Sequence, residues 1–117
     1  MERFMSKFLY GQIWLVNFDP SFGHEYKKVR PALIIQNDRY IKSSNLLTVI
    51  PISSQTIKQA ELDILLKKDS KNRLMVNSLL KVKQISSFDQ QRFIKLIGTV
   101  DEKTMETIKK NIQLFLI

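Results

Sequence analysis

The sequence has 117 residues and a net charge of +8, from 19 Lys and Arg against 11 Asp and Glu. This length suits one domain, which we predict to span residues 1–117, and is too short for two well-packed ones. The absence of cysteine and the single histidine exclude disulfides, thiolate zinc sites, a cysteine nucleophile and a zinc site of several histidines. No apolar run approaches the roughly 18 residues of a membrane span, and the first residues lack the features of a signal peptide. We therefore expect a soluble, basic, cytoplasmic protein with no membrane partner.

The positive charge is concentrated in the middle of the chain. Residues 27–95 hold 14 Lys or Arg and five Asp or Glu, whereas the last 17 residues hold three of each and are neutral. An ordinary solvated surface and a phosphate-binding face are both compatible with this distribution. The charge therefore suggests a polyanionic partner without identifying it.

The first half of the chain predicts strands separated by polar segments. Residues 13–18 are rich in β-branched and aromatic side chains, and period-two alternation places Trp14, Val16 and Phe18 on one face. Residues 31–35 are apolar almost throughout, which is typical of a strand buried on both faces. The predicted elements of this half are an irregular or partly helical arm at 1–9, strands at 13–18, 31–35 and 46–52, a polar loop at 21–30, and a turn or short helix at 38–44.

The second half predicts further strands and one helix. Residues 79–85 alternate cleanly, which would place Lys81 and Lys83 on one exposed face of a strand. Asp101 can cap a helix over residues 101–117, because apolar side chains recur after it at spacings of three and four. That stripe would pack on the sheet and comprises Met105, Ile108, Ile112 and Phe115. The other predicted elements are a loop at 53–58, strands at 60–66 and 93–100, a charged turn at 67–73 and one helical turn at 89–91.

Five or six short strands followed by one amphipathic helix belong to the mainly β class with a C-terminal helix. This order of elements favours a small, strongly curled antiparallel barrel. The sequence contains no internal repeat, low-complexity stretch or interdomain linker.

An ordered set of motifs occupies residues 11–35, GQIWLVNFDPSFGHEYKKVRPALII. A Gly-x-Ile-Trp strand comes first, followed by an Asp-Pro turn, a Gly-x-Glu loop and an Arg-Pro that begins the second strand. Further matches follow in order, at Pro51-Ile52-Ser53-Ser54-Gln55, Ser78, Gln84, Arg92 and Gly98. Over about residues 10–117 the chain resembles the MazF/PemK family of toxin endoribonucleases.

The resemblance implies a fold, an activity and two protein partners. The fold would be an SH3-like barrel with a C-terminal helix, in a homodimer whose RNA groove spans the dimer interface. The activity would be cleavage of single-stranded mRNA without a metal or other cofactor, leaving a 2′,3′-cyclic phosphate and a 5′-hydroxyl. The inhibitor would be an acidic, MazE-like antitoxin that lays a partly disordered segment into the groove, as in type II toxin–antitoxin systems.

Two residues of this sequence match the family's catalytic pattern most directly. Arg30 matches the catalytic arginine, and a guanidinium offers a planar fork to two phosphate oxygens. Because it precedes Pro31, Arg30 is biased toward an extended backbone at a strand entrance. Ser53 matches a threonine of the family and keeps the hydroxyl that can bond the scissile phosphate or the 2′-hydroxyl. Ser54 is the alternative if the register differs by one residue.

The general base is left open between two neighbours in the first loop, Glu25 and His24. Histidine suits acid–base work because its reference pKa is about 6.5. We rank Glu25 slightly above His24, since branches of the family differ in which of the two positions they use. The residues predicted to contact RNA are Lys27, Lys28, Ser54, Gln55, Lys81, Lys83, Gln84, Phe22 and Tyr26, the two aromatic residues by stacking on bases.

The sequence departs from the family at two places. In the PemK-like branch an Arg and an Asp precede the conserved glutamine, and the Asp is the proposed base; here Lys81 and Lys83 precede Gln84. Lysine is a poor base unless burial or a neighbouring charge lowers its pKa, so we expect these lysines to hold phosphates instead. The usual glycine near residue 73 is replaced by Arg73, which bears on the local turn and on base recognition.

Three functions follow from these observations. An endoribonuclease toxin is the leading hypothesis, since Arg30 and the Ser53 hydroxyl are retained. A non-catalytic barrel that binds nucleic acid or a protein partner is the alternative, because a fold does not fix a function. A relative that targets DNA is a third, since basic charge does not distinguish DNA from RNA.

Overall fold

The computed structural model describes residues 7–18 and 29–117. Within this part of the chain, seven antiparallel strands form a sheet in the order β4-β5-β3-β2-β1-β7, and β6 pairs with β3. The strands are β1 (Gln12–Asn17), β2 (Val29–Ile34), β3 (Leu46–Ser53), β4 (Ile64–Leu66), β5 (Ser78–Leu80), β6 (Ser86–Asp89) and β7 (Phe93–Thr99). The helix α1 (Glu102–Leu116) ends the fold, and three short 3-10 turns are η1 (Asp38–Tyr40), η2 (Val82–Gln84) and η3 (Gln90–Arg92).

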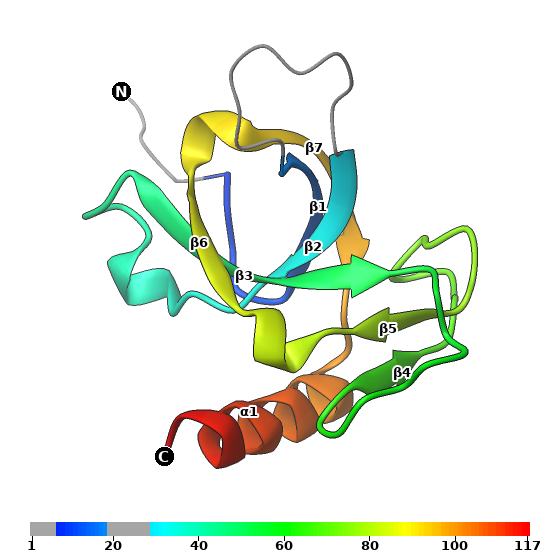
Figure 1. The fold of residues 1–117 in the computed structure, drawn as a ribbon. Coiled ribbons are helices and arrows are strands. Elements are labelled where there is room, and N and C mark those ends of the chain that lie inside the picture. Colours follow the sequence, from blue (N-terminus) through cyan, green and yellow to red (C-terminus); the bar gives the residue numbers. More distant parts are fainter. Residues whose placement is uncertain (1–6, 19–28) are drawn as a thin grey trace, which may run out of the picture.

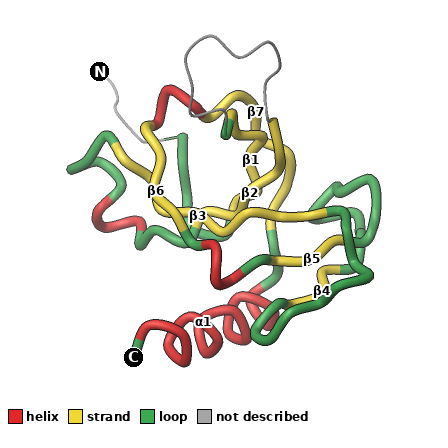
Figure 2. Tube along the Cα trace, in the orientation of Figure 1, coloured by secondary structure: helices red, strands yellow, loops and turns green. Residues whose placement is uncertain are grey.

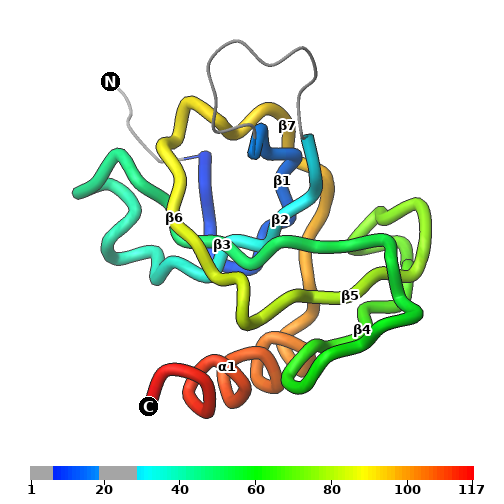
Figure 3. The backbone as a smooth tube through the Cα atoms, in the orientation of Figure 1, coloured from blue at the N-terminus to red at the C-terminus, as the bar shows by residue number. Residues whose placement is uncertain are grey.

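The sheet curls into a barrel-like but open shape (Figure 1). The strand β3 is the longest, and it bonds to β6 with its first half and to β5 with its last two residues. Figure 3 shows β3 running between these two parts of the molecule, with β6 along its first half and β5 near its far end. The strand β3 also pairs with β2 through Val49–Pro51, so the barrel side and the small β4–β5 side are joined through this one strand.

Two buried apolar clusters correspond to these two sides. The barrel side is filled by an aromatic group in which the Phe8 ring lies 4.7 Å from Trp14 and 5.4 Å from Phe93, measured between centroids. The other cluster lies between the sheet and α1, where Met105 and Ile108 are buried. Helix α1 lies beside η2 and β4 at this end of the molecule (Figure 2). Burial of these stripes is the main stabilising term of the fold.

The predicted strands of the first half are confirmed, each to within two residues at its ends. Trp14 and Val16 are buried in the aromatic cluster and Phe18 packs against it, as the alternation predicts. The turn near residue 38 is the 3-10 segment η1, and the single helical turn after Asp89 is η3. In the arm, residues 7–9 carry no helix or strand, yet Phe8 is a core residue, which the sequence analysis did not foresee.

The prediction of one strand over residues 79–85 is wrong. Strand β5 ends at Leu80, and the chain then turns through η2, with the Gln84 N–H donating to the Lys81 carbonyl at 2.9 Å. The turn buries Val82 against the cluster beneath α1. Burial of the Val82 side chain therefore favours a turn here over the extended strand that the alternating pattern predicts. As a result, Lys81 and Lys83 do not lie on one face of a strand.

Three smaller predictions also need correction. The strand expected over 60–66 covers only Ile64–Leu66, because Leu62 has a positive φ of 73° and Asp63 bonds back to the Ala60 N–H. Strand β6 was not predicted, since its sequence SSFD lacks an apolar alternation. Phe115 was placed on the buried stripe of the helix but is 40% exposed.

The start of α1 gives a testable contribution to stability. The Thr104 backbone N–H donates to the Asp101 carboxylate at 2.7 Å, which caps the helix and holds the pKa of Asp101 below its ordinary value. A lowered folded-state pKa stabilises the fold above the unfolded-state pKa, and this contribution is lost as the pH falls through the folded-state pKa. We expect Asp101→Ala to lower the free energy of unfolding by about 1 kcal/mol at neutral pH. Urea unfolding of both proteins should show this difference shrinking as the pH is lowered through the acid range; a difference that grows would contradict the capping role.

Candidate functional site

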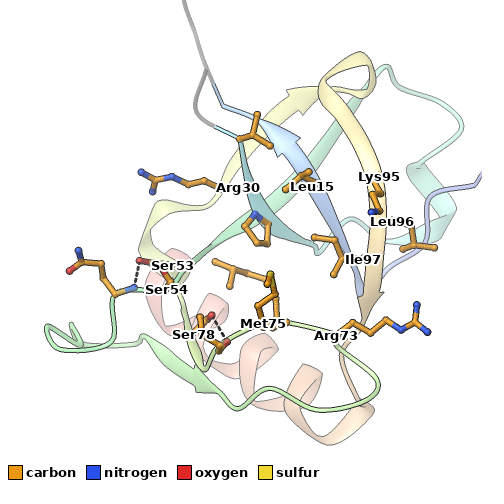
Figure 4. A pocket seen from close by; sticks show the side chains of 16 residues that line it. Leu15, Arg30, Ser53, Ser54, Arg73, Met75, Ser78, Lys95, Leu96 and Ile97 are labelled. Atoms are coloured by element: carbon orange, nitrogen blue, oxygen red, sulfur yellow. Dashed lines mark hydrogen bonds between the residues drawn. The ribbon is translucent and has the colours of Figure 1, made fainter. Parts of the chain in front are cut away.

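A pocket of about 790 Å³ lies where the start of β2, the end of β3 and the middle of β7 meet the segment that precedes β5. Arg30, Ser53 and Ser54 lie on one side of it, and Arg73 lies on the other (Figure 4). Apolar side chains line the space between them, among them Leu15, Pro31, Ile52, Met75, Leu96 and Ile97. A pocket of this size that combines an apolar lining with convergent polar groups is typical of ligand sites.

Arg30 stands near the start of β2, opposite Val16 of β1. Pro31 follows it, and Pro31 pairs with Leu15 in the extended register that the Arg-Pro sequence predicts. Arg30 is exposed and forms no ion pair with any described residue. Its guanidinium is therefore available for an anion that enters the pocket.

Ser53 is the last residue of β3 and is half-buried in the pocket wall. Its hydroxyl oxygen accepts a hydrogen bond from the Gln55 backbone N–H at 3.1 Å. This bond leaves the hydroxyl hydrogen and one lone pair for a ligand. Ser54 and Gln55 follow on the exposed rim of the same pocket. The pairing of β2 with β3 thus brings Arg30 and Ser53 to one site, although 22 residues separate them in sequence.

Several predicted residues lie outside the described part of the chain. These are His24, Glu25, Phe22, Tyr26, Lys27 and Lys28. In sequence they lie between β1 and β2 and precede Val29 and Arg30.

The three predicted residues after β5 do not line the pocket. Lys81 donates to the buried Asp63 carboxylate at 2.6 Å, with side-chain exposures of 18% and 2% respectively. Lys83 and Gln84 lie in η2, on the side of the molecule that faces α1. Lys81 therefore has a structural partner, and the three residues do not form one surface with Arg30 in a single copy of the chain.

Two cations of the pocket were not among the predicted RNA-binding residues, although Arg73 is a departure from the family that bears on base recognition. Arg73 lies in the predicted charged turn, and Lys95 lies in the predicted strand at 93–100. With Arg30 they give three positive charges, and the described lining residues include no Asp or Glu. The alternating pattern of β7 could have predicted that Lys95 faces the pocket. No local sequence pattern predicts that residue 73 lies there. Such a lining favours a polyanion.

Residues 10–116 match the protein family described as PemK-like, MazF-like toxin of type II toxin–antitoxin system. The chain belongs to this family. It is 29% identical over 111 residues to endoribonuclease MazF9 of Mycobacterium tuberculosis, covering 91% of this chain and 93% of that protein. It is 30% identical over 107 residues to endoribonuclease EndoA of Bacillus subtilis, covering 91% of both.

Solved structures of MazF proteins share the fold of this MazF/PemK chain. MazF from Deinococcus radiodurans aligns with a TM-score of 0.75 at 21% identity, over 92% of this chain and 94% of that one. A mycobacterial endoribonuclease in complex with its cognate antitoxin aligns with a TM-score of 0.73 at 17% identity, over 92% and 93%. These likenesses confirm the mainly β, barrel-like fold with a C-terminal helix. In the described part of the chain, no helix is long and apolar enough to cross a membrane.

Proposed function

We propose that this chain is the toxin of a type II toxin–antitoxin system and an endoribonuclease that cuts single-stranded mRNA in the cytoplasm. The proposal rests on one observation above the others: Arg30 and the Ser53 hydroxyl line one pocket that holds three cations and, among its described residues, no carboxylate. The names of the curated relatives, endoribonucleases in each case, support the same activity.

The proposed reaction uses the RNA's own 2′-oxygen as the nucleophile. This oxygen attacks the adjacent phosphorus, the bond from phosphorus to the 5′-oxygen breaks, and the products are a 2′,3′-cyclic phosphate and a 5′-hydroxyl. One proton leaves the 2′-hydroxyl and one is given to the departing 5′-oxygen. The protein must therefore supply a base, an acid and positive charge at the phosphorane.

Arg30 would supply the charge, because its two-pronged donor matches two phosphate oxygens. The Ser53 hydroxyl would bond the scissile phosphate or the 2′-hydroxyl. Glu25 or His24 would take the proton, since both come only a few positions before Arg30 in the sequence. Lys27, Lys28, Phe22 and Tyr26 of that loop would hold the flanking RNA, together with Ser54 and Gln55. Lys83 and Gln84 would contribute only across the groove of a homodimer.

The inhibitor would be an acidic antitoxin. Three cations and an apolar floor at one pocket suit a peptide that alternates carboxylates with apolar side chains. Two solved complexes support this partner: a mycobacterial endoribonuclease with its cognate antitoxin, and MazE-MazF from Deinococcus radiodurans.

The direct experiment incubates the purified protein with a long single-stranded RNA in EDTA and maps the new ends. Discrete cuts that carry cyclic phosphates are expected. Binding without cuts would instead support the second function, a non-catalytic barrel. The lysine at position 83, where the PemK-like branch has Asp, favours this alternative. Cutting that requires a divalent metal would contradict the proposed mechanism.

A pair of serine variants tests the assignment of the hydroxyl. We expect Ser53→Ala to slow cleavage roughly tenfold, because a hydrogen bond to a charged phosphate is worth about 1.5 kcal/mol or more. Ser54→Ala, a loss of the same atom on the exposed rim, should have a smaller effect. Single-turnover rates on one RNA measure both. If Ser54→Ala abolishes cleavage and Ser53→Ala does not, the register is wrong by one residue.

A further inference from the structure

Arg73 has a backbone conformation that its side chain does not favour. Its φ is 56°, in the left-handed region, where a residue with a Cβ is strained and glycine is not. Among the described residues other than glycine, only Leu62 shares a positive φ. The family resemblance implies a glycine near this position, and this chain has arginine there instead.

The surrounding loop enforces this conformation through a closed set of hydrogen bonds. The Asp69 carboxylate accepts from the backbone N–H groups of Lys71 and Asn72, at 2.9 and 2.7 Å. The Asn72 side chain, 1% exposed as a residue, accepts from the N–H groups of Asp69 and Leu74, each at 3.0 Å. The Arg73 N–H then donates to the Asp69 carbonyl at 3.0 Å. Arg73 is thus carried on a rigid turn, with no freedom to relax its φ.

The turn is also fixed to the sheet. The Thr99 N–H of β7 donates to the Lys71 carbonyl at 3.0 Å. This contact is possible because position 98 is glycine: a Cβ there would lie 2.5 Å from the Lys71 and Asn72 carbonyl oxygens. The position of Arg73 relative to β7 and the pocket is therefore set by backbone contacts.

The Arg73 side chain makes no contribution of its own to the fold that would offset the strain. It is exposed, and it forms no ion pair or hydrogen bond through its guanidinium with any described residue. It lies at the edge of the pocket on the side away from Arg30, with Met75 and Ile97 between them, and its side chain projects outward, away from Arg30 (Figure 4). A strained residue on a rigid support, with a free charge at a pocket, is typical of a functional position.

We propose that Arg73 binds a second RNA phosphate at the end of the pocket opposite Arg30, so that the RNA crosses the pocket from one guanidinium group to the other. The apolar side chains between the two arginines would receive a base of the RNA that spans them. Met75 is suited to this contact because its side chain is polarisable and the residue is 89% exposed. This inference rests on the proposed function and adds to it a named phosphate subsite.

The decisive variant is Arg73→Gly, which removes the guanidinium and relieves the backbone strain at the same time. We expect its melting temperature to equal or exceed that of the wild type, while its Kd rises about tenfold for a short single-stranded RNA with 2′-O-methyl riboses, which 2′-attack cannot cut. The slope of log K against log salt should become shallower by about 0.7, as for the loss of one phosphate contact with a single strand. Lys110→Gln is the matched control: it also removes one charge, but from the exposed face of α1, and should leave the melting temperature and the Kd unchanged.

Replacing each phosphate of this RNA in turn by a neutral methylphosphonate locates the contact. The wild type should be sensitive at two separate linkages; Arg73→Gly should lose the sensitivity at one, and Arg30→Ala at the other. If Arg73→Gly binds like the wild type, or loses affinity with no linkage becoming insensitive, the subsite does not exist. Asparagine also adopts a positive φ readily, so Arg73→Asn should give the same result as Arg73→Gly. It replaces the glycine variant in this experiment if that variant does not fold.

The failure of this inference is distinguishable from failure of the proposed function. A wild type that cuts RNA while Arg73→Gly binds normally overturns the subsite alone. A wild type that cuts no RNA, yet shows a linkage whose sensitivity depends on Arg73, overturns the catalytic proposal and leaves the phosphate contact in place.

Discussion

Arg30→Ala is expected to slow RNA cleavage by about two to three orders of magnitude, the cost of removing one strong donor to a charged transition state. The guanidinium is exposed, has no ion-pair partner among the described residues and lines the pocket beside Ser53. Nothing else in the described lining offers a planar pair of donors on that side. Single-turnover cleavage of a defined RNA measures the loss.

The fold should not suffer from this substitution. Position 30 is held in β2 by backbone pairing with β1, and Pro31 keeps the extended conformation whatever side chain precedes it. The melting temperature of Arg30→Ala should therefore match that of the wild type within about 2 °C, as for other surface substitutions.

Arg30→Lys separates charge from geometry. Lysine keeps the positive charge but binds phosphate as a single point, so cleavage should remain well below the wild type while RNA affinity is largely kept. Arg39→Ala, which removes an exposed arginine from η1 outside the pocket, is the matched control and should cleave normally. Near-normal turnover in Arg30→Ala would overturn the assignment of Arg30 as the phosphate-binding catalytic residue.

The sequence predicted the central sheet because its strands carry strong, local signals. Trp14 and Val16 alternate, and the run from Ala32 to Ile34 is apolar without a break; these residues are buried as expected. The Asp101 cap is equally local, since one carboxylate and one N–H three residues away form it. Where neighbours in sequence determine the conformation, the pattern was sufficient.

The sequence failed where a contact distant in sequence decides the conformation. Residues 79–85 alternate like a strand, yet Val82 turns inward to meet the helix, and Lys81 pairs with Asp63, 18 residues before it. The same applies to the pocket. Arg30 and Ser53 could be nominated by family resemblance, whereas Arg73 reaches the site only through a loop whose left-handed turn no local pattern predicts.

Gly98→Ala is expected to lower the free energy of unfolding by about 3 kcal/mol, a large effect for a single methyl group. The added Cβ would lie 2.5 Å from two backbone carbonyl oxygens, those of Lys71 and Asn72. Backbone atoms cannot rotate away as a side chain can, so the loop must lift from β7. The melting temperature should fall by about 10 °C or more for a domain of this size.

The lifted loop should have two local signatures. The hydrogen bond from the Thr99 N–H to the Lys71 carbonyl would break, so the Thr99 amide should exchange its hydrogen faster, while amides between β1 and β2 keep their protection. RNA affinity should fall as well, because Arg73 lies in the same loop and would be displaced with it. Thr99→Ala removes atoms from the neighbouring exposed position and leaves both the backbone donor and the space above Gly98 intact, so it should change the melting temperature little.

This pair of variants also links the fold to the site. Gly98→Ala could be less stable and still bind RNA with unchanged affinity. In that case the position of Arg73 does not depend on the contact between its loop and β7, and Gly98 contributes to stability only. If its stability is unchanged, the close approach of the loop to β7 is not a feature of the folded protein. We expect Gly98→Ala to show both faster amide hydrogen exchange at Thr99 and weaker RNA binding. The two effects together would show that the contact of the loop with β7 determines the position of Arg73.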